Sequence, residues 1–217
     1  MFYQLIDTGN SRSFSARHAL LESAQTDGDV VIIIGEKVGH ALQTLDGSER
    51  KTAVLIELGA ESLGMHTGES RGAEGSNLLG FSRFRLGTDE PTRLVEVVRQ
   101  PGSPATALAA AKEIFEGAGL EMAVCGDFDG RIVDRLVRPY YNAALKRLDE
   151  GLATADDLDM TLKLGLGYPE GPIALLERTG LEHHYDMTHA LFEATGDPAY
   201  APARRARVAK LRAETKA

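Results

Sequence analysis

The sequence is poor in cysteine and in long apolar runs, and both shortages narrow the class of protein. Cys125 is the only cysteine among 217 residues, so the chain cannot form a disulfide with itself. A single cysteine in a strand-like segment is typical of a reducing compartment, and we expect a cytoplasmic location. No apolar run reaches the ~18 residues of a membrane helix, and the first residues lack the pattern of a signal peptide. We therefore expect no membrane partner.

Positive charge is also scarce. Lysine and arginine number 24 against 32 aspartates and glutamates, for a net charge of −8. This balance argues against a nucleic-acid partner, because nothing offsets phosphate repulsion except a basic C-terminal tail. The tail is interpreted as a solvated helix face, and its basic residues are Arg204, Arg205, Arg207, Lys210 and Arg212.

A credible metal site is missing as well. His183, His184 and His189 lie close together in sequence, but no carboxylate completes a ligand set at a suitable spacing. We expect no metal, and we place these histidines on the surface or at partly buried helix positions.

Strand-like and helix-like runs alternate over residues 1–128. The continuous apolar runs Asp29–Gly35 and Thr52–Gly59 suit strands buried on both faces of a parallel sheet. Such alternation is typical of a doubly wound α/β domain, so we predict a shortened Rossmann-like parallel sheet. The other predicted elements are strands at Phe2–Asp7, Leu78–Leu86, Arg93–Arg99 and Met122–Cys125, and a helix at Pro104–Gly117.

The pattern in residues 129–217 predicts an all-α C-terminal domain. Its first helix contains Pro139, which is expected to kink it, and its second begins at a hydroxyl cap, Thr154. A third, longer helix is predicted over Gly171–Gly196 and a fourth from Pro202 onward. The apolar surface of these helices exceeds what so small a bundle buries, which favours a homodimer. The residues concerned are Ile132, Leu136, Tyr140, Leu158, Leu162, Leu175 and Leu176.

The glycine fingerprint of a dinucleotide-binding loop, G-x-G-x-x-G, is absent. The nearest candidate follows the first strand and consists of Gly9, Asn10, Ser11 and Arg12, ahead of a predicted helix at Ser13–Ala24. Its amides and Arg12 could hold a phosphate at that helix N-terminus. Gly9 is its only glycine, so close approach of a pyrophosphate is not favoured. We expect no cofactor.

Three segments resemble the second domain of the short-chain 3-hydroxyacyl-CoA dehydrogenases. Gly130–Ala144, Glu150–Pro172 and Gly196–Pro202 match patterns like PGFIVNRLLxPYxNEA, EGxAxxxDIDxAxKLGxGxPMGP and GDPxYxP. A weaker resemblance runs through the first domain, in which a strand, a helix and a strand of the adenosine half are lacking here. The resemblance implies a Rossmann-like domain followed by a helical domain, pairing through the helical domain, and acyl-CoA chemistry with NAD.

The resemblance also implies four site positions. In the family a histidine removes the hydroxyl proton while hydride passes to NAD, a glutamate orients it, and a serine and an asparagine hydrogen-bond the reacting oxygen. The serine matches Ser62 and the glutamate matches Glu96, whereas the histidine position holds Ser82 and the asparagine position holds Asp134. Serine cannot serve as a general base near neutral pH. A carboxylate at Asp134 opposes charge on the oxygen.

The sequence also allows each of these residues a structural role outside catalysis. Ser62 suits a helix cap, Glu96 could face solvent or pair with an arginine, and Asp134 could pair with Arg135. His66 is the one histidine that could replace the missing base, if it reaches Glu96.

Three functions follow as hypotheses. The first is a degenerate relative of the dehydrogenases that binds an acyl-CoA-like or small acidic ligand, with family catalysis impaired. The second is an active NAD-dependent 3-hydroxyacyl-CoA dehydrogenase, of the 3-hydroxybutyryl-CoA type, with a rearranged site. The third is an interaction protein whose helical domain pairs with itself or with a full-length homologue.

Overall fold

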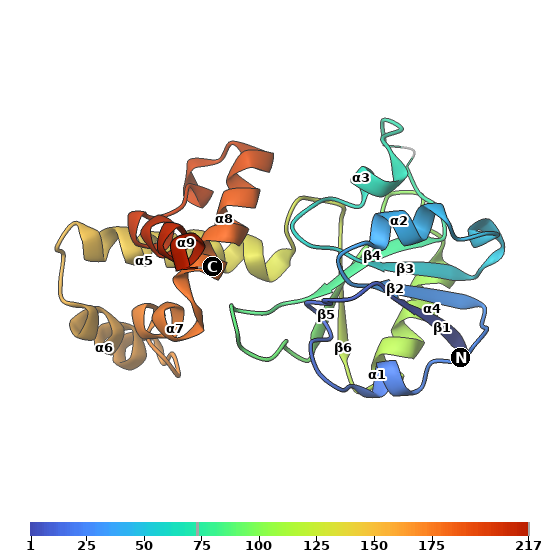
Figure 1. Cartoon of the computed structure of the whole chain (residues 1–217), viewed down its shortest axis with the longest axis horizontal. Helices are drawn as coiled ribbons and strands as arrows, with labels where there is room; N and C mark the ends of the chain where they lie inside the picture. Colours follow the sequence, from blue (N-terminus) through green and yellow to red (C-terminus); the bar gives the residue numbers. More distant parts are fainter. Residues whose placement is uncertain (73, 217) are drawn as a thin grey trace. The chain divides into compact units, whose positions relative to one another are not determined.

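A six-stranded sheet forms the first part of the chain (Figure 1). The computed structural model describes residues 1–72 and 74–216. Neighbouring strands follow the sequence order, and every adjacent pair is parallel except β4–β5. The strands are β1 Tyr3–Asp7, β2 Val30–Ile34, β3 Ala53–Glu57, β4 Leu78–Arg83, β5 Leu94–Val98 and β6 Glu121–Cys125.

The predicted fold class, a Rossmann-like sheet followed by helices, is confirmed, and the sheet is parallel except at β4–β5. The connection between these two strands contains no helix, so the chain turns back directly and pairs antiparallel. Every residue of β2 and β3 is buried, as their continuous apolar runs predict.

Helices cover both faces of the sheet. Helices α1 (Ala19–Glu22) and α4 (Ala105–Gly117) pack on one face, where Leu20 and Phe115 are fully buried. Helix α2 (Val38–Gln43) and the segment that begins α3 (Gly64–Thr67) pack on the other, through Val38 and Leu63. In the view of Figure 1, α2 and α3 lie on the upper side of the sheet and α1 on the lower side. A short 3-10 turn, η1 (Ser48–Arg50), precedes β3.

The segment between β1 and β2 departs from the predicted helix at Ser13–Ala24. Only Ala19–Glu22 is helical. The backbone amide of Ser13 donates to the Glu57 carboxylate at 2.6 Å, and the Phe14 ring packs against Phe81. These tertiary contacts hold Ser13 and Phe14 out of the helix, although their local sequence tolerates one.

The second part of the chain is helical. By its internal contacts it comprises Ile132–Ala217 together with Leu86–Asp89 from the β4–β5 connection, while the first part comprises Met1–Arg85 and Glu90–Arg131. Its elements are α5 Ile132–Asp149, α6 Ala155–Leu166, α7 Pro172–Thr179, α8 Leu181–Thr195, η2 Pro198–Tyr200 and α9 Arg204–Lys216.

Local sequence explains most of these helix ends. Helix α5 runs through Pro139. The Thr154 hydroxyl accepts from the Asp157 amide and caps α6, as predicted. The single helix predicted over Gly171–Gly196 is wrong, because Gly180 separates α7 from α8 with a φ of +97°, a conformation that glycine adopts readily. Leu176, expected on the apolar surface, is fully buried in the helical core. Among the described residues, no helix has the length and apolar character needed to cross a membrane.

Candidate functional site

Ser82 and Glu96 are direct partners across the antiparallel pair β4–β5. Opposed residues of such a pair have Cβ atoms about 5 Å apart on the same face. The structure therefore brings together the two positions that the resemblance gives to the catalytic histidine and its orienting glutamate. Glu96 is only 1% exposed, so the interpretation that it faces solvent is wrong.

A buried arginine lies close to Glu96. Arg131 is fully buried, and it donates through Nη1 to the Phe128 carbonyl at 2.7 Å and through Nη2 to the Glu61 carbonyl. Burial lowers the pKa of Arg131, and the charges of nearby groups, Glu61 and Glu96 among them, oppose that change. The surroundings of Glu96 thus support the alternative in which an arginine balances its charge.

Ser62 lies just before α3 and does not cap it. The N-terminal amides near α3 are bound instead by Asp127, which accepts from Leu63 at 2.6 Å and from Gly64 at 2.8 Å. The α3 N-cap position is Leu63, without a capping side chain. Because its carboxylate accepts from two amides at the start of α3, Asp127 caps this helix and Ser62 does not.

His66 faces a different glutamate from the one expected. Its Nε2 lies 3.8 Å from Glu61 Oε1, beyond hydrogen-bond distance. Among the described residues this is the ion-pair contact that His66 makes, so the structure offers no support for His66 as a base held by Glu96.

Asp134 lies in α5, in the helical part of the chain. Its carboxylate accepts from Arg138 Nε at 2.7 Å, and both groups are buried. The expected partner, Arg135, is the wrong neighbour, because residues four apart share a helix face and adjacent residues do not. Arg138 therefore offsets the negative charge that replaces the family's amide.

A buried polar chain continues from this ion pair. Arg138 Nη1 donates to His184 Nδ1 at 3.3 Å, which leaves His184 Nε2 to donate to Asn142 Oδ1 at 3.0 Å. Asn142 Nδ2 then donates to the carbonyls of Ala199 and Ala201. Each donor in this series meets an acceptor, so the histidine is fixed as the neutral Nε2–H tautomer.

His184 is a core residue and not a surface one, which corrects the expectation for it. It is 1% exposed, and burial together with the Arg138 charge lowers its pKa to about 3. His183 and His189 are about half exposed. No group of three metal-binding side chains occurs among residues 1–72 and 74–216.

The loop of Gly9, Asn10, Ser11 and Arg12 follows β1, and its neighbouring amides are bound internally. The Gly9 amide donates to Asp7 Oδ1 at 2.8 Å, and the Phe14 amide donates to Ser11 Oγ at 3.0 Å. Arg12 is exposed. Because α1 starts only at Ala19, the helix predicted from Ser13 does not offer its N-terminus to this loop.

Glu57 links the segment after this loop to the segment after β2. It is buried at the end of β3, and its carboxylate accepts from the Ser13 amide at 2.6 Å and from the Gly35 amide at 2.7 Å. Gly35 lies so near the loop that an added Cβ would stand 2.3 Å from the Gly9 carbonyl oxygen. A protein carboxylate thus accepts from amides in the segments that follow β1 and β2, where an external phosphate would need free donors.

The strand order of the described sheet also differs from that of a dinucleotide-binding sheet. Rossmann sheets bind dinucleotides where the strand order reverses, beside the first strand. Here β1 pairs only with β2 among the described strands, and the order runs from β1 to β6 without a reversal. The described residues therefore do not fit an NAD bound in the Rossmann manner.

The helical part matches a known protein family. A family model described as "3-hydroxyacyl-CoA dehydrogenase, C-terminal domain" matches residues 130–217. The helical part is thus a 3-hydroxyacyl-CoA dehydrogenase C-terminal domain, and the chain is similar to proteins of that family.

The similarity extends beyond the helical part. Over 211 residues the chain is 26% identical to a 3-hydroxybutyryl-CoA dehydrogenase of Bradyrhizobium diazoefficiens, covering 89% of this chain and 72% of that protein. A mitochondrial hydroxyacyl-coenzyme A dehydrogenase of Sus scrofa is 34% identical over 110 residues, 46% of this chain and 35% of that enzyme.

A solved structure agrees with both. The (S)-3-hydroxybutyryl-CoA dehydrogenase of Ralstonia eutropha has a TM-score of 0.69 at 26% identity, covering 82% of this chain and 64% of that one. The chain thus spans about a third to almost three quarters of these relatives. The family is NAD-dependent, so the comparisons do not support our expectation that no cofactor is used.

Three residues of this region were missed by the sequence interpretation: Glu57, Asp127 and Arg131. The first two carry a visible signal, since each carboxylate stands at or just after the C-terminal end of a predicted parallel strand. Arg131 occupies the position where the family pattern has phenylalanine, an apolar residue. An arginine at an apolar position needs a buried partner for its charge, and this was the available signal.

Proposed function

We propose that this relative of the 3-hydroxyacyl-CoA dehydrogenases binds an acyl-CoA-like or small acidic ligand without transferring hydride by the family route. The observation that carries the proposal is the Glu57 carboxylate, which holds the Ser13 and Gly35 amides beneath the loop after β1. The edge position of β1 adds to it.

Impaired proton transfer supports the same proposal. Ser82 has no side-chain group that titrates near neutral pH, and its partner Glu96 is buried near the Arg131 charge. Loss of a positioned base costs about 10²–10⁴-fold in rate. The acyl-CoA-like ligand is inferred from the names of the relatives, which are 3-hydroxybutyryl-CoA dehydrogenases.

Calorimetric titration with acetoacetyl-CoA, paired with an NADH-consumption assay on the same sample, tests the proposal. We expect saturable acetoacetyl-CoA binding and no NADH oxidation above a protein-free blank. Coenzyme A and acetoacetate, titrated separately, divide the binding between its two halves. Absence of acetoacetyl-CoA binding would reject the proposed ligand, and steady NADH oxidation would reject the loss of catalysis.

One observation favours an active NAD-dependent dehydrogenase as a second candidate. The β4–β5 register keeps Ser82 opposite Glu96, so a single substitution, Ser82→His, would restore the family pair. Under the first proposal, Ser82→His stays inactive with acetoacetyl-CoA and NADH, alone or combined with Asp134→Asn. Turnover in either variant, against Ser82→Ala as control, would show that the cofactor site survives.

We also propose a homodimer through the helical part, which is the basis of the interaction-protein hypothesis. Helices α5 and α6 expose Leu136, Met160, Leu164 and Leu166. Apolar side chains grouped on neighbouring elements are typical of an interface.

A further inference from the structure

The connection between β4 and β5 contains a four-residue segment, Leu86–Asp89, which we call the strap. By its contacts the strap belongs to the helical part, although the strands on either side of it belong to the sheet. Leu86 is buried, whereas Thr88 is exposed. The strap thus lies at the surface of the helical part and depends on a few contacts for its position.

The C-terminal end of α7 forms a close-fitting seat for the strap. The Thr88 amide donates to the Thr179 carbonyl at 3.1 Å. Gly87 has a φ of +54°, and a Cβ added there would collide with the same carbonyl oxygen. Glycine is therefore required at this position by both the backbone conformation and the space.

Arg178 of α7 holds the strap through two carboxylates. Its Nη1 and Nη2 donate to the two carboxylate oxygens of Asp89 at 2.5 and 3.0 Å. Its Nε and Nη2 donate to those of Glu170 at 3.0 and 2.9 Å, and these bonds lower the pKa of Glu170. Bidentate pairs of arginine and carboxylate are among the stronger charged hydrogen bonds. We call Asp89, Arg178 and Glu170 the triad.

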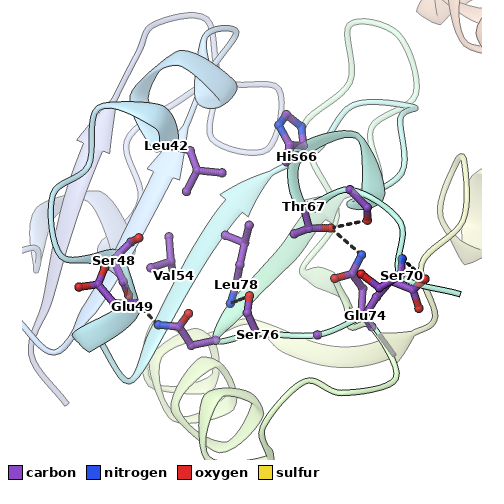
Figure 2. A pocket seen from close by; sticks show the side chains of 14 residues that line it. Leu42, Ser48, Glu49, Val54, His66, Thr67, Ser70, Glu74, Ser76 and Leu78 are labelled. Carbon is purple, nitrogen blue, oxygen red and sulfur yellow. Dashed lines mark hydrogen bonds between the residues drawn. The ribbon is translucent and has the colours of Figure 1, made fainter. Parts of the chain in front are cut away.

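The triad differs from charged groups that bind only within their own loop. At a cavity of about 420 Å³ in the first part of the chain, Glu74 accepts from the Ser70 and Gly72 amides of its own loop, as Figure 2 shows for Ser70. Glu49 at the same cavity lies 3.5 Å from its neighbour Arg50. The triad instead joins residues 89 positions apart in the sequence, so it can hold one element on another.

The triad is open to water and to dissolved ions. Its three side chains are between 36% and 49% exposed. The distance over which exposed charges interact falls from about 30 Å at 0.01 M salt to about 3 Å at 1 M. The remaining polar contact of the strap, the Thr88 amide bond, contributes only about 1 kcal/mol. The position of the strap therefore depends on the triad, and the triad depends on ionic strength.

We propose that the triad is a salt-sensitive latch on the strap. At low ionic strength the latch holds the strap in its seat on α7. At high ionic strength the strap leaves the seat while the sheet and the helices stay folded. Because the strap lies between β4 and β5, the closed latch also restrains the open end of the strand pair that carries Ser82 and Glu96.

Amide hydrogen exchange at Thr88 measures the opening of the latch. The rate is followed by NMR on isotopically labelled full-length protein between about 0.02 M and about 1 M NaCl, and it is divided by the intrinsic rate at each salt concentration. We expect the corrected rate to rise about five- to tenfold with salt. The amides of Ile32 and Leu55, in the buried strands β2 and β3, report global unfolding and stay unchanged.

Two variants open the latch by different means. Arg178→Ala removes the ion pairs, so Thr88 exchanges about five- to tenfold faster at low salt and no longer responds to added salt. Gly87→Ala displaces the strap by steric collision, so exchange is fast although the triad residues are intact. Arg205→Ala is the matched control, because it breaks another exposed ion pair of the helical part, with Asp149 at 2.6 Å, and leaves Thr88 exchange and its salt response unchanged.

Asp89→Asn keeps the test informative if Arg178→Ala does not fold, which the thermal transition reveals. It removes one charge with little change of shape and gives a smaller salt response than the unsubstituted chain. The proposal is overturned if Thr88 exchange in the unsubstituted chain does not respond to salt, or if Arg178→Ala or Asp89→Asn keeps the full response. It is also overturned if Ile32 and Leu55 exchange faster in parallel with Thr88.

Discussion

Glu57 shows how one buried carboxylate can substitute for a bound anion. Its two oxygens accept from the amides of Ser13 and Gly35, which come from the segments that follow β1 and β2. Amides at the C-terminal ends of parallel strands bind phosphate in dinucleotide folds. In this chain the acceptor is covalently part of the protein, so the two segments are held without a ligand.

Removing Glu57 is expected to destabilise the protein. Glu57→Ala leaves two buried amides without acceptors and costs about 3 kcal/mol in the free energy of unfolding. Glu57→Gln keeps one acceptor oxygen and costs about half as much. Urea unfolding measures both, with Glu36→Ala, an exposed neighbour, as the control. Equal stability of Glu57→Ala and Glu36→Ala would contradict the role given to Glu57.

His184 is expected to make the stability of the protein depend on pH. Its pKa of about 3 lies below the ordinary value of about 6.5, so the unfolded chain binds a proton that the native protein does not. The contribution of His184 to the free energy of unfolding is complete above about pH 6.5. It decreases as the pH falls below that value, by about 2 kcal/mol at pH 5.

The measurement is the change in unfolding free energy between pH 7.5 and pH 5. His184→Gln reduces this change by about 2 kcal/mol relative to the unsubstituted chain. His189→Gln, which removes an exposed histidine from the same helix, serves as the matched control. An unaltered pH dependence in His184→Gln would show that the histidine is not held neutral.

At the scale of elements, Asp127 joins the end of β6 to the start of α3. Its carboxylate accepts from Leu63 and Gly64 and from the Gln100 amide. Asp127→Ala is therefore expected to cost about 1–2 kcal/mol and to raise amide hydrogen exchange at Leu63 and Gly64. Asp46→Ala, an exposed site, is the control. Unchanged exchange at both amides would contradict the capping role.

Much of the element pattern could be predicted from the sequence. The buried strands Val30–Ile34 and Ala53–Glu57 follow from apolar runs, and the α6 start follows from Thr154. The helix at Ser13–Ala24 and the unbroken helix at Gly171–Gly196 could not be corrected locally. The first depends on a carboxylate 44 residues away, and the second on the conformation that Gly180 adopts.

The candidate site was less predictable than the elements. The resemblance placed Ser82 and Glu96, and the β-register brings them together. Charge pairing was not predictable, because the arginine near Glu96 is Arg131 and the partner of Asp134 is Arg138. Such pairings depend on which side chains share a buried face, and adjacency in sequence does not reveal that.

At the scale of the whole molecule, we predict self-association through α5 and α6. Light scattering over a hundredfold concentration range should give a mass above the 23.4 kDa of one chain. Leu164→Glu places a charge at an 81% exposed apolar position and shifts the equilibrium to monomer, whereas Phe2→Glu, at 75% exposure in the first part, does not. A constant mass of 23.4 kDa would end the dimer proposal.

Titration with NADH tests whether this chain binds the cofactor. The chain contains no tryptophan, so the fluorescence of NADH can be followed without energy transfer from indole groups. The internal binding of the Ser13 and Gly35 amides by Glu57, together with β1 at the sheet edge, predicts no saturable NADH binding below millimolar concentration. A micromolar dissociation constant would contradict the account and restore the NAD-dependent dehydrogenase as the first candidate.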